Sequence, residues 1–435
     1  MKIKDVFKKL TFSREKKTFL TLGLEYFIKI LLGTIVSVWV ARFLGPEDYG
    51  NFTYIISFVL IFSPFYTMAC EEVLIKYLVE EEYSHDLIMG SGFLFKLLGS
   101  LIGFILVNGF AFYFAPDNDL IKVGIFVYSI FMMLKAFQVI DNYYLAIKNI
   151  KVVSFFRNII MVILSLCKIA GILNGKSWLW FVYISSFELF LYMLFYSITY
   201  FKDGKYLWSW KPNNILISKL FKISFPLVLI SFCSLGVAKL DQVMIMNIKG
   251  SVELGKYAVS VKLIELWQFV PMALISSFFP KIVSSFSNSK QEYRKNVKEL
   301  YFMIITFSLL LATGTTIVSE PLIKLLYGEM YLGAGRILAL YSWTILFLYI
   351  TLARNKIFII ENLVLLEVMV VALTLVINFA LNIVMIPMYG AEGAILASVG
   401  SYFLANVLAS IVSKRMRMAN RDILVSLSQV KTFFK

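Results

Sequence analysis

Long apolar runs, each of the length needed to cross a membrane, recur along the whole chain. A helix rises about 1.5 Å per residue, so about 20 apolar residues span the hydrocarbon core of a bilayer. We expect two sets of six spans, at 18–41, 51–75, 87–114, 120–147, 152–173 and 177–201, and at 223–248, 252–280, 300–319, 336–360, 363–387 and 391–413. Hydrophobic residues make up 60% of the chain and charged residues only 16%, which excludes a soluble globular protein. The sequence predicts an all-α polytopic membrane protein with about 12 transmembrane helices.

Basic residues are distributed unequally between the two sides that these spans define. The side that holds the N-terminus has 29 of the 42 Lys and Arg residues, the opposite side has 7, and the spans have 6. The positive-inside rule therefore predicts that both termini are cytoplasmic. The net charge of +15 is explained by this topology, so it does not indicate a nucleic-acid partner.

Residues that carry metal or thiol chemistry are few. Cys70, Cys167 and Cys233 lie inside apolar runs, and the single histidine, His85, lies in a polar loop. None of them has the spacing of metal ligands, so we expect no metal site, no disulfide scaffold and no cofactor. No extramembrane segment exceeds about 25 residues, which leaves no room for a separate catalytic domain and argues against an enzyme.

A short internal repeat relates the two sets of spans. Gly45-Pro-Glu-Asp-Tyr-Gly50-Asn-Phe52 follows the first span, and Gly250-Ser-Val-Glu-Leu-Gly255-Lys-Tyr257 follows the seventh, at an offset of 205 residues. Both copies face the same side, which predicts a parallel repeat of two six-helix halves. We expect an N-terminal half (1–201), an amphipathic interfacial linker helix (202–222), a C-terminal half (223–413) and a basic cytoplasmic tail (414–435).

Charged residues within the spans are the strongest functional signal, because each costs about 2.5–3.5 kcal/mol to insert near the bilayer centre. They comprise Lys29, Lys96, Lys135, Lys168, Lys239, Lys262, Glu25, Asp141, Glu188, Asp241, Glu265 and Glu367. Lys168, Asp141 and Glu367 lie near span ends, where the polar interface can solvate them. The other charges, with polar residues aligned on the same helix faces, predict a shared hydrated interior.

The spacing of these charges also bears on how they are used. Glu25 with Lys29, and Lys262 with Glu265, are close enough along one helix to form ion pairs, which can be structural or functional. Lys96 lies in a stripe with Gly92, Gly99 and Gly103, which predicts close helix approach beside a charge. Lys239 and Asp241 point in nearly opposite directions, so one of them is expected to pack between helices.

Several ordered motifs resemble those of one known family. They are Ala41-Arg-Phe-Leu-Gly-Pro-Glu-Asp-Tyr-Gly50, Phe225-Pro-Leu, Lys239-Leu-Asp241, Gly255-Lys-Tyr257-Ala, Val270-Pro-Met-Ala-Leu, Phe279-Pro280, Pro321-Leu-Ile-Lys-Leu-Leu-Tyr-Gly328 and Tyr389-Gly-Ala-Glu-Gly-Ala394. Together they are similar to Wzx-type polysaccharide flippases of the multidrug/oligosaccharidyl-lipid/polysaccharide exporter superfamily. The resemblance extends from about residue 10 to residue 413.

The resemblance implies a V-shaped transporter of the bacterial inner membrane. It would flip undecaprenyl-diphosphate-linked oligosaccharides to the outer leaflet for O-antigen or capsule synthesis, by alternating access coupled to H⁺ or Na⁺. Its other partners would be membrane lipids and proteins of polysaccharide assembly. Lys29 and Lys262 stand where related flippases carry cavity arginines.

Residue chemistry and resemblance together give the candidate site. Lys29, Lys96, Lys135, Lys239 and Lys262 are expected to contact the diphosphate or acidic sugars, because a diphosphate needs cations to cross hydrocarbon. Glu25, Glu188, Asp241 and Glu265 are the candidates for binding the coupling ion.

Two alternatives remain open. A multidrug exporter of the same superfamily would favour an acid-rich, aromatic cavity for organic cations, which the deep lysines do not match. A membrane polysaccharide polymerase or glycosyltransferase would need a sizeable loop or domain with catalytic motifs, which the sequence lacks.

Overall fold

The computed structural model describes residues 14–433, with side chains for residues 33–149 and 152–427, and every regular element in this part of the chain is a helix. Nine of these helices are long and apolar enough to cross a membrane, and one bent pair makes a tenth. Two elements each contain two arms joined at a glycine, α2 (Arg14–Ile61) at Gly45 and α16 (Val364–Val412) at Gly390. With these arms counted separately, the described chain makes the twelve passes that the apolar runs predict.

The first six passes form the N-terminal lobe. After α2 they are α3 (Ser63–Thr67) with α4 (Glu71–Glu80), α5 (His85–Phe114), α6 (Asp119–Met132) with η1 (Met133–Gln138) and α7 (Val139–Ala146), α8 (Ile150–Leu173) and α9 (Trp178–Lys202). The second pass bends by 52° where α2 meets α3. It is interrupted again at Met68 and Ala69, which both have positive φ. Glycines of α5 pack against this broken pass, because a Cβ on Gly99 would lie 2.2 Å from the Met68 sulfur. The glycine stripe thus allows close helix approach, as predicted.

Apart from the first turns of the seventh pass, which pack in the core of the N-terminal lobe through Leu216 and Leu220, the next six passes and a terminal helix form the C-terminal lobe. They are α10 (Asn214–Lys249), α11 (Ser251–Glu265) with η3 (Leu266–Gln268) and α12 (Phe269–Asn288), α13 (Lys290–Tyr327) with η4 (Glu329–Tyr331), α14 (Ala334–Tyr341), α15 (Thr344–Ile360), α16 and α17 (Lys414–Phe433). The predicted basic tail includes α17, whose Met416 is buried with the core that α13 and α15 share. Ser426 Oγ donates to the Lys298 carbonyl at 3.1 Å, which fastens α17 to α13.

The connection between the lobes differs from the expected interfacial helix. Residues 203–213 form an irregular segment that contains the single turn η2 (Leu207–Ser209), and α10 begins at Asn214. Asn213 caps α10, because its Oδ1 accepts hydrogen bonds from the N–H groups of Ile215 and Leu216 at 2.9 and 3.1 Å. Residues 214–222 are therefore the first turns of the seventh pass, and no separate helix forms over 202–222.

The internal repeat forms two equivalent elbows. Gly45 (φ 71°, ψ 174°) and Gly250 (φ 89°, ψ 179°) have nearly the same backbone conformation, which only glycine adopts without strain. A Cβ on Gly50 would lie 2.0 Å from the Ser251 carbonyl oxygen, and a Cβ on Gly255 would lie 2.0 Å from the Pro46 carbonyl oxygen. These two contacts exchange under the 205-residue offset, so the elbows touch each other across a pseudo-twofold axis.

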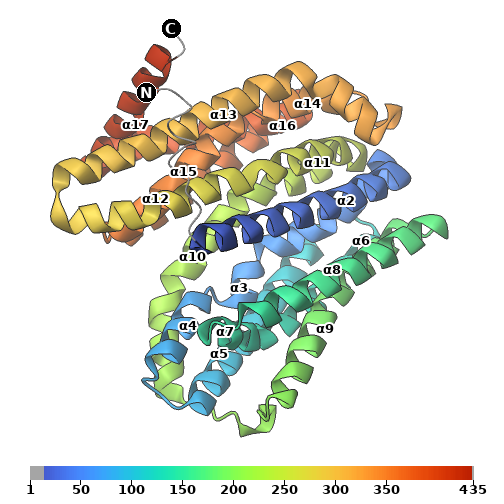
Figure 1. Ribbon diagram of the computed structural model, residues 1–435. Helices are drawn as coiled ribbons and strands as arrows, with labels where there is room; N and C mark the ends of the chain where they lie inside the picture. The colour runs from blue at the N-terminus through green and yellow to red at the C-terminus, as the bar shows by residue number, and fades with distance from the viewer. Residues whose placement is uncertain (1–13, 434–435) are drawn as a thin grey trace.

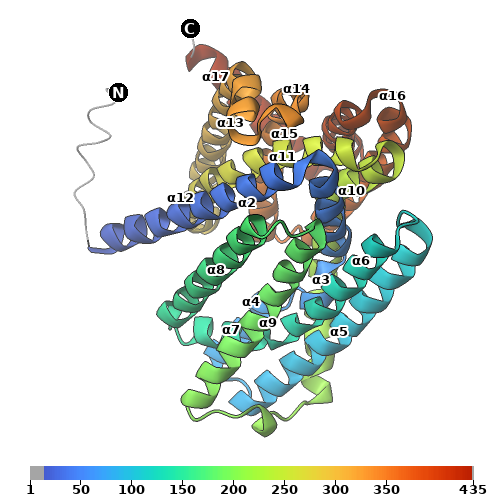
Figure 2. The same ribbon diagram turned by 90° about the vertical axis from the view of Figure 1, so that its right-hand side faces the viewer.

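Figure 1 shows the resulting V shape. The C-terminal lobe, with α12, α13 and α17, lies above the N-terminal lobe, with α4, α7 and α8. The lobes meet at the right-hand end, where α2 bends, and diverge toward the end from which α17 projects. Figure 2 shows α2 running between the two lobes. Its side chains Val38, Ala41 and Tyr49 are buried in the core of the C-terminal lobe, which makes α2 a shared wall.

Candidate functional site

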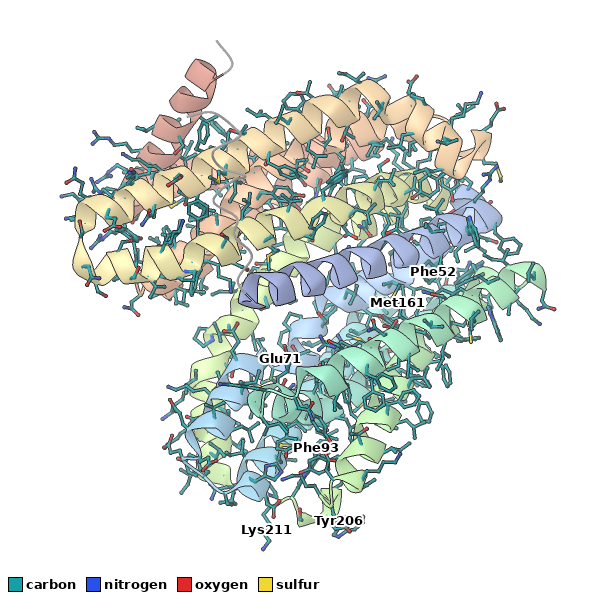
Figure 3. All side chains as sticks on the ribbon, viewed as in Figure 1. Phe52, Glu71, Phe93, Met161, Tyr206 and Lys211 are labelled. Atoms are coloured by element: carbon teal, nitrogen blue, oxygen red, sulfur yellow. The ribbon has the colours of Figure 1, made fainter. Side chains whose placement is uncertain are left out.

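A cavity of about 1210 Å³ lies between the lobes. Both halves of the repeat contribute to its walls, which include Thr34, Ser37, Tyr49, Phe52, Ser57, Tyr128, Lys168, Ser185, Glu188, Lys239, Gln242, Lys262, Glu265, Gln268 and Met272. Figure 3 shows Phe52 between α2 and α8, near the end where the lobes meet, and Glu71 on the lower lobe toward the opposite end. One part of the cavity wall therefore lies near the end where the lobes meet.

Three charged groups of the C-terminal lobe form a connected set on one wall. Lys239 Nζ on α10 lies 3.1 Å from Glu265 Oε1, and Lys262 Nζ on α11 lies 3.8 Å from Glu265 Oε2. All three side chains are partly exposed, Lys262 most of all at 42%. Pro271 has no N–H group to donate to the Trp267 carbonyl. This missing helical hydrogen bond accounts for the 3₁₀ turn η3, which directly follows Glu265. The sequence predicted the Lys262–Glu265 pair but not its link to Lys239.

The facing wall, from the N-terminal lobe, carries a lysine and an acid. Lys168 on α8 and Glu188 on α9 both line the cavity and attract each other. Lys168 and Lys262 repel each other from opposite lobes. Lys168 was expected to be solvated near a span end, but it lines the cavity instead. Its polar neighbour Ser165, one turn earlier on the same face, was the signal that could have placed Lys168 in the interior.

A direct hydrogen bond joins the lobes across the cavity. Ser57 of α2 donates to Gln242 Oε1 of α10, and both residues line the cavity. Farther toward the elbows, Asn247 Nδ2 donates to the Phe114 carbonyl at 3.0 Å, and Tyr331 Oη donates to the Ala41 carbonyl at 2.7 Å. These bonds close the V at its narrow end. Sequence reasoning missed Ser57 and Gln242 because neither carries a charge.

Asp241 lies on the other face of α10 from the cavity and is only 3% exposed. Its Oδ1 accepts a hydrogen bond from Asn382 Nδ2 at 2.7 Å, and its Oδ2 accepts from Ser398 Oγ at 2.7 Å and Tyr257 Oη at 3.1 Å. The Asn382 Oδ1 atom is buried and has no donor among the described residues. Of the two groups expected to diverge, Lys239 faces the cavity and Asp241 packs between α10 and α16.

Lys96 and Lys135 lie inside the N-terminal lobe and do not line the central cavity. Lys96 is 0% exposed, and its Nζ has no hydrogen-bond partner among the described residues. Lys135 lies on η1, where Glu71 and Glu188 attract it and Lys96 repels it. These two lysines thus form an interior group of their own, connected to the cavity wall through Glu188.

Two other predicted residues lie outside the described side chains, and one basic residue was misplaced. Glu25 and Lys29 belong to the part of α2 whose side chains the structure does not describe. Arg354, one of the 29 basic residues assigned to the side of the N-terminus although it falls inside the expected span 336–360, is 1% exposed within α15. It donates from Nε and Nη2 to the two carboxylate oxygens of Glu367 at 3.2 and 3.3 Å. Glu367 is therefore a buried ion-pair partner instead of a residue solvated at a span end.

No group of three or more His, Cys, Asp or Glu residues that could bind a metal ion occurs in the described part of the chain. The candidate site thus consists of lysine ammonium groups, two carboxylates and neutral polar groups. Lysine ammonium groups on facing walls can bind an anion.

The fold is shared with solved structures of transporters. The chain is similar to the structure of the lipid II flippase MurJ in an inward closed conformation, at 16% identity and a TM-score of 0.68, over 95% of this chain and 92% of that chain. It is also similar to a multidrug resistance MATE family transporter of the MOP superfamily in an inward-facing conformation, at 10% identity and a TM-score of 0.67, over 90% and 96% of the two chains. A MOP superfamily transporter from Pyrococcus furiosus matches at 12% identity and a TM-score of 0.57, over 95% and 96%. These identities show a shared fold.

The family follows from the sequence. The model of a family described as polysaccharide biosynthesis protein matches residues 39–335, more than half of the chain, so this protein belongs to that family. No curated protein matches the sequence. Family and fold together confirm the resemblance to the Wzx-type flippases of the MOP superfamily.

Proposed function

We propose that this protein flips an undecaprenyl-diphosphate-linked oligosaccharide from the cytoplasmic to the outer leaflet of a bacterial inner membrane. The observation that carries the proposal is the set of three lysines, Lys168, Lys239 and Lys262, on facing walls of a cavity between two membrane-spanning lobes. Together with the carboxylates of Glu188 and Glu265, these three lysines give the cavity a formal charge of +1. Such an uncompensated charge is costly inside a membrane, where the cavity would lie. An anionic substrate would supply the missing charge.

Glu265 has a defined part in this proposal. Its carboxylate contacts Lys239 and Lys262, so it stands where a phosphate group would bind. A diphosphate entering the cavity would displace it and contact the same two ammonium groups. When the substrate leaves, Glu265 returns and neutralises them, so the empty transporter can reverse without exposing two unpaired cations.

Charge across the cavity links substrate binding to closure. Lys168 and Lys262 repel each other from opposite lobes, which opposes any movement that brings the lobes together. A diphosphate carries negative charge to both lysines, so it would turn repulsion into attraction. The lobes then rock about the touching elbows at Gly50 and Gly255, with 1–201 and 223–413 as the moving halves.

Asp241 is the candidate that best fits a coupling cation. It is a buried carboxylate with neutral oxygens around it, including the unpaired Asn382 Oδ1. A small cation such as H⁺ or Na⁺ has the size and charge that this group would bind. Its cluster joins α10 to α16, so loading would change how these two helices pack. Glu188 is a second candidate, because it links the cavity to Lys135.

The orientation is part of the proposal. Placing both termini in the cytoplasm follows from the 29 to 7 distribution of basic residues. The mouth of the V then faces the cytoplasm, where lipid-linked oligosaccharides are assembled. The polyprenyl tail would stay in the bilayer while the head enters between the lobes.

The experiment uses a strain lacking this gene and complemented with variants. Lys168→Ala/Lys262→Ala is expected to reduce surface polysaccharide at least tenfold, because both walls lose a phosphate contact. Lys176→Ala/Lys222→Ala removes the same charge from outside the cavity and is the matched control. Normal polysaccharide in the cavity variant would overturn the proposal.

The same strain separates the two alternatives. A multidrug exporter predicts raised drug susceptibility with unchanged polysaccharide. A polymerase predicts unpolymerised repeat units already exposed on the outer leaflet, whereas a missing flippase leaves them facing the cytoplasm.

A further inference from the structure

A second cavity, of about 300 Å³, lies in the C-terminal lobe and shares no lining residue with the central one. Four elements enclose it: the end of α12, the start of α13, the end of α15 and the start of α17. All four ends lie on the side of the molecule where the lobes diverge (Figure 1), which the proposed orientation makes the cytoplasmic side. Its volume is at the lower limit of small-ligand pockets, which is about 300 Å³.

The rim of this cavity is cationic. Lys290 and Arg294 come from α13, and Arg415 comes from α17. No ion pair joins any of the three to a carboxylate among the described side chains. Arg294 Nη2 contacts the Met418 sulfur at 3.7 Å, and a thioether is a weak acceptor for a guanidinium group. These cations are therefore available to an anion.

The two acids of the cavity are already engaged. Glu361 Oε1 accepts a hydrogen bond from Tyr293 Oη at 2.7 Å, and Asp422 Oδ1 lies 3.6 Å from Lys298 Nζ. With Lys298 included, four cations face two carboxylates. The balance of charge at the cavity is positive.

The inner wall of the cavity is mostly apolar. Val297, Ile357 and Phe358 line it, together with Tyr301, which is 1% exposed. The cavity thus combines an apolar wall with a cationic rim.

We propose that this cavity binds the phosphate group of an anionic membrane phospholipid. Arg294 and Arg415 hold the phosphate oxygens from two sides. The apolar wall contacts the glycerol and the first carbons of the acyl chains. Because the two arginines belong to α13 and α17, the bound lipid ties the terminal helix to the lobe.

The test measures lipid binding to the purified full-length protein by native mass spectrometry and thermal shift. The probes are short-chain phosphatidylglycerol, phosphatidylcholine of equal chain length, and inorganic phosphate. We expect phosphatidylglycerol to bind about tenfold more tightly than phosphatidylcholine, because the choline cation is repelled by the rim. Inorganic phosphate should bind more weakly than either lipid, since it lacks the apolar contact.

Matched variants separate the cavity from general surface charge. Arg294→Gln/Arg415→Gln should weaken phosphatidylglycerol binding about tenfold. Lys295→Gln/Arg421→Gln removes two exposed cations of the same two helices that lie outside the cavity. This variant should change phosphatidylglycerol binding less than twofold. Equal losses in both double variants, no preference for phosphatidylglycerol, or free phosphate binding as tightly as the lipid would each overturn the proposal.

Discussion

Two charged groups on α10, only two residues apart, have opposite environments. Lys239 faces the central cavity, is partly exposed and shares Glu265 with Lys262. Asp241 faces α16, is 3% exposed and accepts three hydrogen bonds from neutral donors. The first group can exchange its carboxylate partner for a substrate anion. The second is closed to anything larger than a small cation. In the proposed function one helix thus separates a substrate site from a coupling site, and variants of each should have different effects.

The largest effect is expected for Asp241→Asn. The amide cannot take up a proton or neutralise a cation, so gradient-driven transport should fall on the order of 100-fold, equivalent to about 2.7 kcal/mol. Diphosphate binding should stay near the wild-type value. The thermal midpoint should be unchanged or higher, because a buried charge is removed. Transport by this variant that still follows the ion gradient would refute the coupling role.

A smaller, opposite pattern is expected for Lys262→Ala. A hydrogen bond to a charged group is worth about 1.5–3 kcal/mol, so affinity for a soluble short-chain polyprenyl diphosphate should fall roughly tenfold. Isothermal titration calorimetry on the purified protein measures it, with Lys222→Ala on α10 as control. If Asp241→Asn lowered this affinity as much, the two sites would not be separate.

Glu265→Gln should increase affinity. The amide no longer competes for Lys239 and Lys262, and each partly exposed ion pair is worth about 0.2–1 kcal/mol, so the diphosphate should bind roughly two- to fivefold more tightly. Turnover should nevertheless slow, because the empty cavity retains two unpaired cations. Weaker diphosphate binding in this variant would show that Glu265 holds the lysines in place instead of competing with the substrate.

The smallest effect is expected for Ser398→Ala. It removes the 2.7 Å hydrogen bond to Asp241 but leaves Asn382 and Tyr257 in place. A net contribution of about 0.5–1.5 kcal/mol predicts an approximately threefold shift in the ion concentration for half-maximal transport. Diphosphate affinity should not change. A shift in that affinity would mean that the Asp241 group and the cavity communicate even without transport.

Regular patterns in the sequence predicted the fold well. The apolar runs predicted the membrane-spanning helices, because bilayer thickness sets helix length. The glycine repeat marked the elbows, because positive φ and close backbone contact both require glycine. The boundary at 202–222 was wrong, since apolar and basic residues suit the start of a spanning helix as well as an interfacial one. Asn213, a typical N-cap, was the signal for where α10 starts.

The site was predicted less completely, for a physical reason. A single helix shows which residues share a face, so it separated Lys239 from Asp241. It does not show what the face contacts. Lys96 and Lys135 are enclosed in one lobe, Lys168 lies in the cavity, and Arg354 is buried against Glu367. These placements depend on helix packing, on which sequence spacing carries no information.

The most direct test of the central claim is a leaflet assay in proteoliposomes. A labelled polyprenyl-diphosphate oligosaccharide is placed on one side, and its arrival in the other leaflet is followed with a membrane-impermeant sugar-modifying enzyme. The account predicts transfer by the wild-type protein that accelerates with an ion gradient and is lost in Lys168→Ala/Lys262→Ala. Transfer at the wild-type rate by that variant would contradict it.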